Sequence, residues 1–190
     1  LTNDLLYLAR IDHDDGNVIF SKVSFSEAAE SVILLMEAVI FENNVNLTYD
    51  ITPDLFVNGS TEQLKQLVMI LLDNAVKYTP DGGNVDVEIF EENPEEEKKI
   101  RLIAKIRDNG IGMEQNFLPH IFDAFAQEDD RNTTLSGGTG LGLTISKNII
   151  DFMGGKIDVY SEKGKGSAFV VTVPLKTCLL YTSPSPRDAH

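Results

Sequence analysis

The sequence is poor in several residue types, and each shortage excludes a class of protein. Its 190 residues include one cysteine, no tryptophan and three histidines. A single Cys178 excludes an internal disulfide, which is consistent with a reducing compartment. Positive charge is also scarce, because 16 Lys and Arg stand against 30 Asp and Glu, which gives a formal net charge of -14 at pH 7.

This charge balance limits the possible partners. Nucleic-acid backbones and anionic lipid surfaces are bound by clustered Lys and Arg, so we expect neither as a direct partner. An anionic nucleotide would need local compensation from a metal ion, oriented backbone N–H groups or a placed lysine. No apolar run approaches the roughly 18 residues that a membrane helix requires, so we expect no membrane contact by this chain.

The hydrophobic pattern predicts helices mixed with strands. Helices are predicted at 1–11, 27–42, 61–78, 115–125 and 141–153, and strands at 18–25, 45–51, 55–57, 84–90, 100–107, 156–162 and 167–175. Ser26 and Ser60 are expected to cap the helices that follow them. Because the order lacks strict βαβ alternation, we expect an α+β fold in two layers, with a mixed, mostly antiparallel sheet covered on one face by helices.

The predicted helix 61–78 carries a polar stripe opposite its apolar one. The stripe follows spacings of three and four through Gln63, Gln66, Ile70, Asn74 and Lys77. Asn74 lies in an almost wholly apolar part of the sequence, and a buried amide costs about 1 to 3 kcal/mol when unpaired. It therefore needs a partner, which is either the protein backbone or a ligand. Lys77 is either a solvated surface residue or an anion contact.

Two glycine-bearing segments add further polar chemistry. In RDNGIGM, Asp108 ends a predicted strand, and Gly110 and Gly112 let the backbone turn and leave room for a planar group. The carboxylate could accept a hydrogen bond from an exocyclic amine, although the same residues fit an ordinary Asx turn. In SGGTGLGLTISKNI, glycines precede a predicted helix, and free backbone N–H groups at a helix N-terminus suit phosphate.

The glycine-rich segment fits neither of the common nucleotide fingerprints. It lacks the G-K-[ST] of a P-loop, and no βαβ unit with an acidic residue follows it. Read alone, it could be a flexible hinge. Taken together, the amide and lysine, the carboxylate and the glycine-rich helix start suit Mg-ATP.

Four segments together resemble a known family. QLVMILLDNAVKYTP, DNGIGM, IFDAFAQ and GGTGLGLTISKNI resemble the N, G1, F and G2 boxes of the catalytic ATP-binding domain of sensor histidine kinases. That family belongs to the superfamily of gyrase, Hsp-type chaperone, histidine kinase and MutL ATPases. The resemblance covers about residues 21–174. It implies a Bergerat-type α/β sandwich in which ATP lies between the N-box helix and a lid.

The resemblance also implies roles for individual residues. The implied nucleotide contacts are Asn74, Lys77, Tyr78, Asp108, Gly110, Gly112, Phe125, Gly138, Thr139, Gly140, Leu141, Gly142 and Ser167. Among them, Asn74 is the implied Mg²⁺ ligand. Asn74 and Lys77 are together the implied catalytic residues. Asp108 is expected to receive the adenine amine, with Ser167 as a polar neighbour of the base. Phe122 and Phe125 are expected to anchor the lid, whose variable part is 127–136.

One departure from the family pattern bears on the reaction. Ile70 stands four residues before Asn74, where many of these kinases have a second Asn and the gyrase-type ATPases have a catalytic Glu. Isoleucine can act neither as a base nor as a metal ligand, which favours phosphoryl transfer to a protein acceptor over ATP hydrolysis. Neither His13 nor His120 lies in an acceptor motif, so we expect the acceptor histidine upstream of this chain.

The resemblance suggests how the chain is organised. Residues 1–17 resemble the end of the dimerisation and phosphoacceptor hairpin, and residues 18–176 resemble the catalytic ATP-binding domain. We expect residues 177–190 to be a non-native or disordered tail. The chain opens with LTNDLLYLAR, without Met or a leader pattern, and we expect it to be a piece of a longer protein. Its lid sequence resembles hybrid kinases, in which a receiver domain follows.

The expected function follows from this resemblance. We expect transfer of the γ-phosphoryl group of Mg-ATP to a histidine of the parent kinase in two-component signalling. The catalytic portion is expected in the cytoplasm, with the parent kinase anchored in a membrane or not. Two alternatives stay open, which are a regulatory module that binds nucleotide without transfer and a serine kinase of the anti-sigma-factor type.

Overall fold

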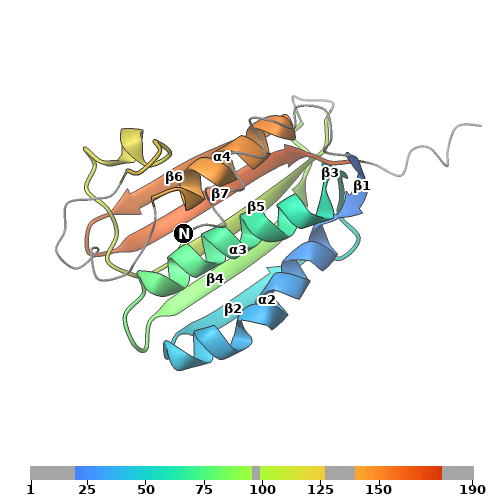
Figure 1. Cartoon of the computed structure of the whole chain (residues 1–190). Coiled ribbons are helices and arrows are strands. Elements are labelled where there is room, and N and C mark those ends of the chain that lie inside the picture. Colours follow the sequence, from blue (N-terminus) through green and yellow to red (C-terminus); the bar gives the residue numbers. More distant parts are fainter. Residues whose placement is uncertain (1–19, 96–98, 127–139, 177–190) are drawn as a thin grey trace, which may run out of the picture.

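A computed structural model describes residues 20–95, 99–126 and 140–176 (Figure 1). The predicted hairpin end at 1–17 and the predicted tail at 177–190 lie outside these ranges. Within the described residues, no helix is both long and apolar enough to cross a membrane.

Five strands form the main sheet in the order β2-β4-β5-β7-β6. Their bounds are Asn46–Ile51 for β2, Asn84–Glu92 for β4, Arg101–Asp108 for β5, Gly166–Pro174 for β7 and Lys156–Glu162 for β6. β2 and β4 are parallel, and the other three pairs are antiparallel. Two short strands, β1 (Ser21–Ser24) and β3 (Phe56–Gly59), form a separate antiparallel pair. The predicted mixed, mostly antiparallel sheet is confirmed.

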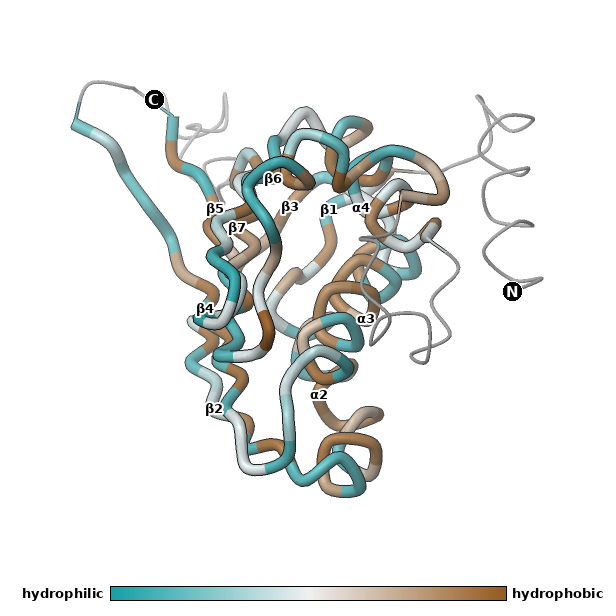
Figure 2. Tube along the Cα trace, turned by 90° about the vertical axis from the view of Figure 1, so that its left-hand side faces the viewer, coloured by the Kyte–Doolittle hydropathy of each residue, from teal (hydrophilic) through white to brown (hydrophobic). Residues whose placement is uncertain are grey.

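The helices α2 (Phe25–Glu42), α3 (Thr61–Lys77) and α4 (Gly142–Phe152) cover one face of this sheet. Figure 2 shows the same arrangement from the side, with the strands in one layer and the helices in the other. The predicted α+β fold in two layers is therefore confirmed.

The central helix α3 forms where capping and periodicity agree. The Oγ of Ser60 accepts a hydrogen bond from the backbone N–H of Gln63 at 3.5 Å, as expected for an N-cap. The predicted apolar stripe is buried along its whole length, at Leu64, Leu67, Val68, Leu71, Leu72 and Ala75. Burying a leucine side chain contributes roughly 1.5–3 kcal/mol relative to leaving it exposed. This stripe therefore holds α3 on the sheet.

The predicted cap of the first described helix is wrong by two residues. The N-cap of α2 is Ser24, whose Oγ accepts from the N–H of Glu27 at 3.1 Å. Ser26 is buried in the first turn, where its hydroxyl donates to the Thr52 carbonyl at 2.6 Å and accepts from the N–H of Leu55 at 3.1 Å. Both serines lie shortly before Glu27, so the local sequence allows either to be the N-cap. The contacts of Ser26 with Thr52 and Leu55 occupy its hydroxyl and leave Ser24 as the cap.

The helix predicted at 115–125 is also wrong. The structure has only a 3-10 helix, η1 (Leu118–His120), with turns on both sides. Pro119 has no backbone N–H to donate within a helix. Phe125 adopts φ 62, in the left-handed region that ends a right-handed helix. The apolar spacing of this segment serves packing against the core without a regular helix.

The register of β5 and β7 places a polar pair at the end of a buried row. Leu102, Ala104 and Ile106 lie opposite Val173, Val171 and Phe169, and all six are buried. Because successive side chains of a strand point to opposite faces, Asp108 lies on the same face as this row. Its partner at the end of β7 is Ser167. The row thus ends in Asp108 and Ser167 on the helix-covered face of the sheet.

We expect Leu67→Ala to lower the free energy of unfolding by about 2–5 kcal/mol, because Leu67 is fully buried and its truncation leaves a cavity. The matched control is Leu34→Ala on α2, since Leu34 is 65% exposed. That variant should change stability by less than about 0.5 kcal/mol. Chemical denaturation of both variants measures the difference, and equal losses would contradict the assigned packing of α3.

Candidate functional site

Three segments with polar motifs meet at one end of the sandwich. The backbone N–H of Ile111, in the loop after β5, donates to the Tyr78 carbonyl at the end of α3 at 3.2 Å. At the start of α4, a Cβ added to Gly142 would lie 3.1 Å from Cγ2 of Ile70 on α3. The fold therefore brings together the end of α3, the end of β5 and the start of α4.

Asp108 is the buried charge of this region. It is 6% exposed, and its Oδ1 accepts a hydrogen bond from the backbone N–H of Gly110 at 2.9 Å. Burial raises the pKa of this carboxyl, and hydrogen bonds from the backbone N–H groups of Gly110 and Ser167 offset part of the rise. A carboxylate in this setting is an acceptor with lone pairs to spare for a ligand that donates.

The glycines of the loop after β5 are required by close packing. A Cβ at Gly110 would come within 3.0 Å of both the Tyr78 carbonyl oxygen and Oδ1 of Asp108. Gly112 has φ 67, and a Cβ there would press against the Glu162 carbonyl. The space that these glycines leave is thus filled by the protein's own backbone. That packing holds the loop, and with it Asp108, in one position.

The polar stripe of α3 is only partly as predicted. Gln63 is buried with its Oε1 unpartnered among the described residues, so it does not share the accessible face. Asn74 is half-buried, and no side chain or backbone group within the described ranges hydrogen-bonds to its amide. Nζ of Lys77 lies 3.0 Å from Oδ2 of Asp73, with side chains 40% and 39% exposed. Asn74 and Lys77 are both accessible to a ligand.

The start of α4 lacks the devices that cap the other helices. α2 and α3 each begin with a serine cap and an acidic residue in the first turn, whereas α4 has neither. The first N–H groups of a helix have no partner within the helix, and the helix dipole makes this end positive. Leu141 is buried in the core, so its side chain is not available to a ligand. Gly138 and Thr139 lie outside the described residues.

Two phenylalanines lie beside the segment 127–136, which is outside the described ranges. The Phe122 carbonyl accepts from the Thr144 hydroxyl at 3.0 Å, which ties it to α4. Phe125 donates its N–H to the Gly140 carbonyl at 3.0 Å, and its side chain is 66% exposed. Hydrogen bonds of both residues thus tie the segment that ends at Phe125 to the start of α4.

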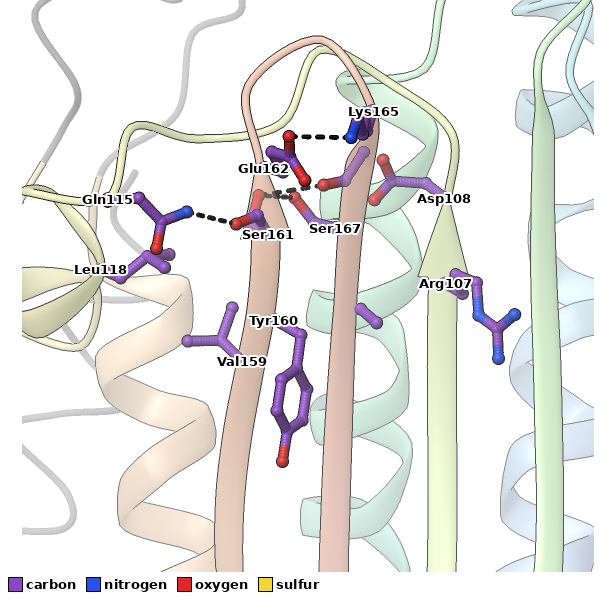
Figure 3. Close-up of a pocket in the computed structure, with 12 residues that line it drawn as sticks. Arg107, Asp108, Gln115, Leu118, Val159, Tyr160, Ser161, Glu162, Lys165 and Ser167 are labelled. Carbon is purple, nitrogen blue, oxygen red and sulfur yellow. Dashed lines mark hydrogen bonds and ion pairs between the residues drawn. The ribbon is translucent and has the colours of Figure 1, made fainter.

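Ser161 on β6 is a polar residue that sequence reasoning missed. Its Oγ lies 2.8 Å from Oγ of Ser167 (Figure 3). The same oxygen accepts a hydrogen bond from the backbone N–H of Met113 at 2.9 Å. In the sequence, Ser161 is one hydroxyl among many in an ordinary strand pattern. Only the pairing of β6 with β7 shows that Ser161 faces Ser167, so no local signal could have found it.

A hollow of about 500 Å³ lies at the same end of the sheet. Asp108, Ser161 and Ser167 line it together with Arg107 and Tyr160, and no residue of α3 or α4 contributes. Alternation along the strands puts Arg107 and Tyr160 on the face away from the helices, as Figure 3 shows. The hollow therefore lies at the end of the strands, and it adjoins the helix-covered face only through residues such as Asp108, Ser161 and Ser167.

The described residues offer few side chains that could bind a metal at this end of the sandwich. Among the described residues, no group of three or more His, Cys, Asp or Glu side chains could hold a metal ion. A metal at this end of the sandwich would therefore need oxygens from a bound ligand beside those of the protein. Mg²⁺ suits this arrangement, because it keeps several waters and is often held by one or two protein oxygens plus phosphates.

The comparisons with known proteins agree with this geometry. Residues 59–177 match the family described as histidine kinase-, DNA gyrase B-, and HSP90-like ATPase. The autoinducer 2 sensor kinase/phosphatase LuxQ of Vibrio parahaemolyticus is 35% identical over 176 residues, which are 92% of this chain. The chain spans only 20% of the length of that relative.

Two solved structures resemble the described fold. The catalytic domain of histidine kinase ThkA matches with a TM-score of 0.67 and 25% identity, over 82% of this chain and 97% of that one. Full-length ShkA, solved in complex with AMPPNP, matches with a TM-score of 0.74 and 25% identity, over 93% of this chain and 35% of that one. The two-layer sandwich is therefore the fold of histidine kinase catalytic domains.

We expect Gly110→Ala to destabilise the protein by about 1–3 kcal/mol, because the added methyl would displace the Tyr78 carbonyl or the Asp108 carboxyl. The control is Gly59→Ala, whose Cβ would meet only Met153, at 3.4 Å. That change should be neutral or slightly stabilising, since alanine restricts the unfolded chain. Denaturation curves of the two variants test this, and a stable Gly110→Ala protein would contradict the tight loop packing.

Proposed function

This chain belongs to the histidine kinase-, DNA gyrase B-, and HSP90-like ATPase family, and we propose that residues 18–176 are the catalytic domain of a sensor histidine kinase. The proposed reaction is transfer of the γ-phosphoryl group of ATP to a histidine of the parent protein. One observation carries the proposal: a buried acceptor, an accessible amide and lysine, and a helix start without a side-chain cap meet at one end of the sandwich.

Asp108 is the proposed contact to the base. Its carboxylate accepts from the exocyclic amine of adenine, and its position at the end of the buried row limits the competition from water. A base with an oxygen in place of that amine would leave two acceptors facing each other. Sites built to bond one polar group reject analogues that lack it, because buried groups are then left unpaired. Adenine is therefore the proposed base.

The start of α4 and Lys77 are the proposed contacts to the phosphates. Backbone N–H groups in the first turn of α4, which begins at Gly142, supply donors, and the helix dipole favours an anion at this end. Lys77 is paired with Asp73 in a half-exposed ion pair, which contributes only about 0–1 kcal/mol. A nucleotide phosphate can therefore compete for Lys77. These local groups offset a chain whose net charge is -14.

Mg²⁺ is the proposed metal, with the amide oxygen of Asn74 as its ligand from the protein. When bound, it would offset the negative charge of the phosphates. Tyr78, at the C-cap of α3, is proposed to add a phosphate contact beside Lys77. Ile70, which packs against Gly142, can supply neither a metal ligand nor a base. This supports transfer to a protein acceptor over hydrolysis by an activated water.

In the proposed transfer, an imidazole nitrogen attacks the terminal phosphorus. An N–P bond forms, the bond between phosphorus and the β,γ-bridging oxygen breaks, ADP leaves, and the imidazole gives up its N–H proton. The protein contributes by positioning and by charge stabilisation.

The acceptor histidine is proposed to lie on the hairpin whose end is 1–17, and a receiver domain is proposed to follow the catalytic domain. We propose that the catalytic domain works in the cytoplasm, whether or not its parent is anchored in a membrane.

A module that binds nucleotide without transfer is the second candidate. Ile70 motivates it, because the position offers no polar group next to Asn74. Transfer to histidine is favoured over transfer to serine, since LuxQ is a sensor kinase/phosphatase and ThkA is a histidine kinase. Adding an acceptor hairpin distinguishes a kinase domain from a module that only binds nucleotide, because the module would leave the hairpin unphosphorylated.

Calorimetric titration with a non-hydrolysable ATP analogue tests the metal role. We expect saturable binding that strengthens with Mg²⁺, and we expect Asn74→Ala to lose that gain while keeping metal-free binding. Gln66→Ala, on the same stripe of α3, is the matched control and should retain the gain. A Mg²⁺ effect that survives Asn74→Ala would contradict the assignment of Asn74 as ligand.

A labelling experiment tests the transfer. With ATP labelled in its γ-phosphate, label on an added hairpin supports transfer, and binding without label on the hairpin supports the second candidate.

The pH dependence of binding tests the role of Asp108. Burial raises the pKa of this carboxyl, so the acceptor is lost by protonation at a higher pH than for an ordinary aspartate. At neutral pH, ADP should bind about 10- to 100-fold more tightly to the wild type than to Asp108→Asn, as expected for a hydrogen bond to a charged group. This ratio should fall towards one as the pH is lowered. Phosphate protonation affects both proteins, so a ratio independent of pH would contradict the assignment.

A further inference from the structure

We infer that Ser161 is a positioning residue that fixes the direction of the Ser167 hydroxyl, and so makes the base end of the site accept hydrogen bonds without donating them. The inference rests on the proposed function, because it concerns how this site distinguishes an amine from an oxygen. Asp108, Ser167 and Ser161 form one row across β5, β7 and β6, since each lies opposite the next in the register (Figure 3).

The hydroxyl of Ser161 makes three contacts, which use its whole capacity. It accepts from the N–H of Met113 at 2.9 Å, lies 3.0 Å from the Gly166 carbonyl, and lies 2.8 Å from Oγ of Ser167. A serine hydroxyl has one proton and two acceptor lone pairs. The Met113 N–H must use a lone pair, and the Gly166 carbonyl can only accept the proton. One lone pair is left for Ser167.

Ser167 must therefore be the donor in its contact with Ser161. If Ser161 gave its proton to Ser167, its oxygen and the Gly166 carbonyl would stand 3.0 Å apart with no hydrogen between them. Two acceptors at that distance repel. The hydrogen-bond pattern that satisfies all three contacts is thus the one in which the Ser167 proton points to Ser161.

This direction decides what Ser167 offers to a ligand. With its proton spent on Ser161, its hydroxyl has only lone pairs left. Asp108, directly opposite on β5, is also an acceptor and takes hydrogen bonds from the backbone N–H groups of Gly110 and Ser167. An exocyclic amine has protons to give to this end of the row, whereas an oxygen there would be repelled.

Removal of the Ser161 hydroxyl would release the Ser167 proton. The Asp108 carboxylate on the neighbouring strand is then the strongest acceptor facing Ser167. A hydrogen bond between them would engage the carboxylate with a protein donor. Turned to a ligand instead, the same single proton would make Ser167 a donor to a ligand oxygen. Both changes weaken binding of an amine relative to an oxygen at the same ring position.

The experiment compares ADP with the 5′-diphosphate of 6-O-methylinosine, which carries an oxygen in place of the amine at ring position six and keeps N1 as an acceptor. Dissociation constants are measured with the full chain and Mg²⁺, for the wild type, Ser161→Ala and Ser161→Thr. We expect Ser161→Ala to reduce the preference for ADP by about tenfold, the scale of one hydrogen bond. Ser161→Thr keeps a hydroxyl and should keep the preference. A purely structural role would weaken both nucleotides equally and leave the preference unchanged.

A second pair of variants tests whether the effect passes through Ser167. In the background of Ser167→Ala, Ser161→Ala still removes the acceptor of the Met113 N–H, but there is no hydroxyl to redirect. We expect the ADP preference of the double variant to equal that of Ser167→Ala. A further loss of preference in the double variant would overturn the inference. If Ser161→Ala does not fold, Ser161→Cys replaces it, because a thiol is a weak donor and a weak acceptor of similar size.

The outcomes separate this inference from the proposed function. If the wild type binds neither nucleotide, the proposed function fails and the inference fails with it. If the wild type prefers ADP and Ser161→Ala or Ser161→Cys retains that preference, only the inference is overturned.

Discussion

The packing of the apolar stripe of α3 against the sheet is the interaction on which the rest of the structure depends. This stripe is buried from its first turn to its last, so the position and rotation of the helix are fixed. The fixed rotation presents Asn74 and Lys77 on the accessible side. It also places the Tyr78 carbonyl where the loop after β5 binds it, and Ile70 where α4 begins. The site is thus a consequence of how one helix is held.

The proposed base end of the site has its carboxyl group where burial disfavours a charge. Asp108 continues a row of buried apolar side chains, and its raised pKa shows that desolvation outweighs the help of two backbone N–H groups. Such a group stabilises the fold less than an apolar residue would, which is typical of residues kept for function. Tight packing at Gly110 prevents the loop from relaxing away from it. The carboxylate is therefore held ready for a ligand.

The proposed phosphate end depends on a different kind of interaction. A chain with a net charge of -14 repels anions at long range, yet partial charges at a helix start act within a few ångströms. The start of α4 has no side-chain cap and no acidic residue, unlike α2 and α3. Lys77 adds one full charge from α3, now balanced by Asp73. Attraction is thus concentrated at one place, while the remaining surface stays acidic.

The sequence was sufficient for the features that depend on near neighbours. Periodicity and a serine cap identified α3, and the strand pattern with its terminal acid identified Asp108, because capping and alternation act within a few residues. The cap at Ser26 was wrong because the turn between β2 and β3 binds its hydroxyl, and the helix at 115–125 was wrong because Pro119 and the turns around it leave only a 3-10 helix. Ser161 and the burial of Gln63 had no local signal. Strand register and helix rotation place these side chains, and both are fixed by contacts between residues distant in sequence, which no single stretch of the chain records.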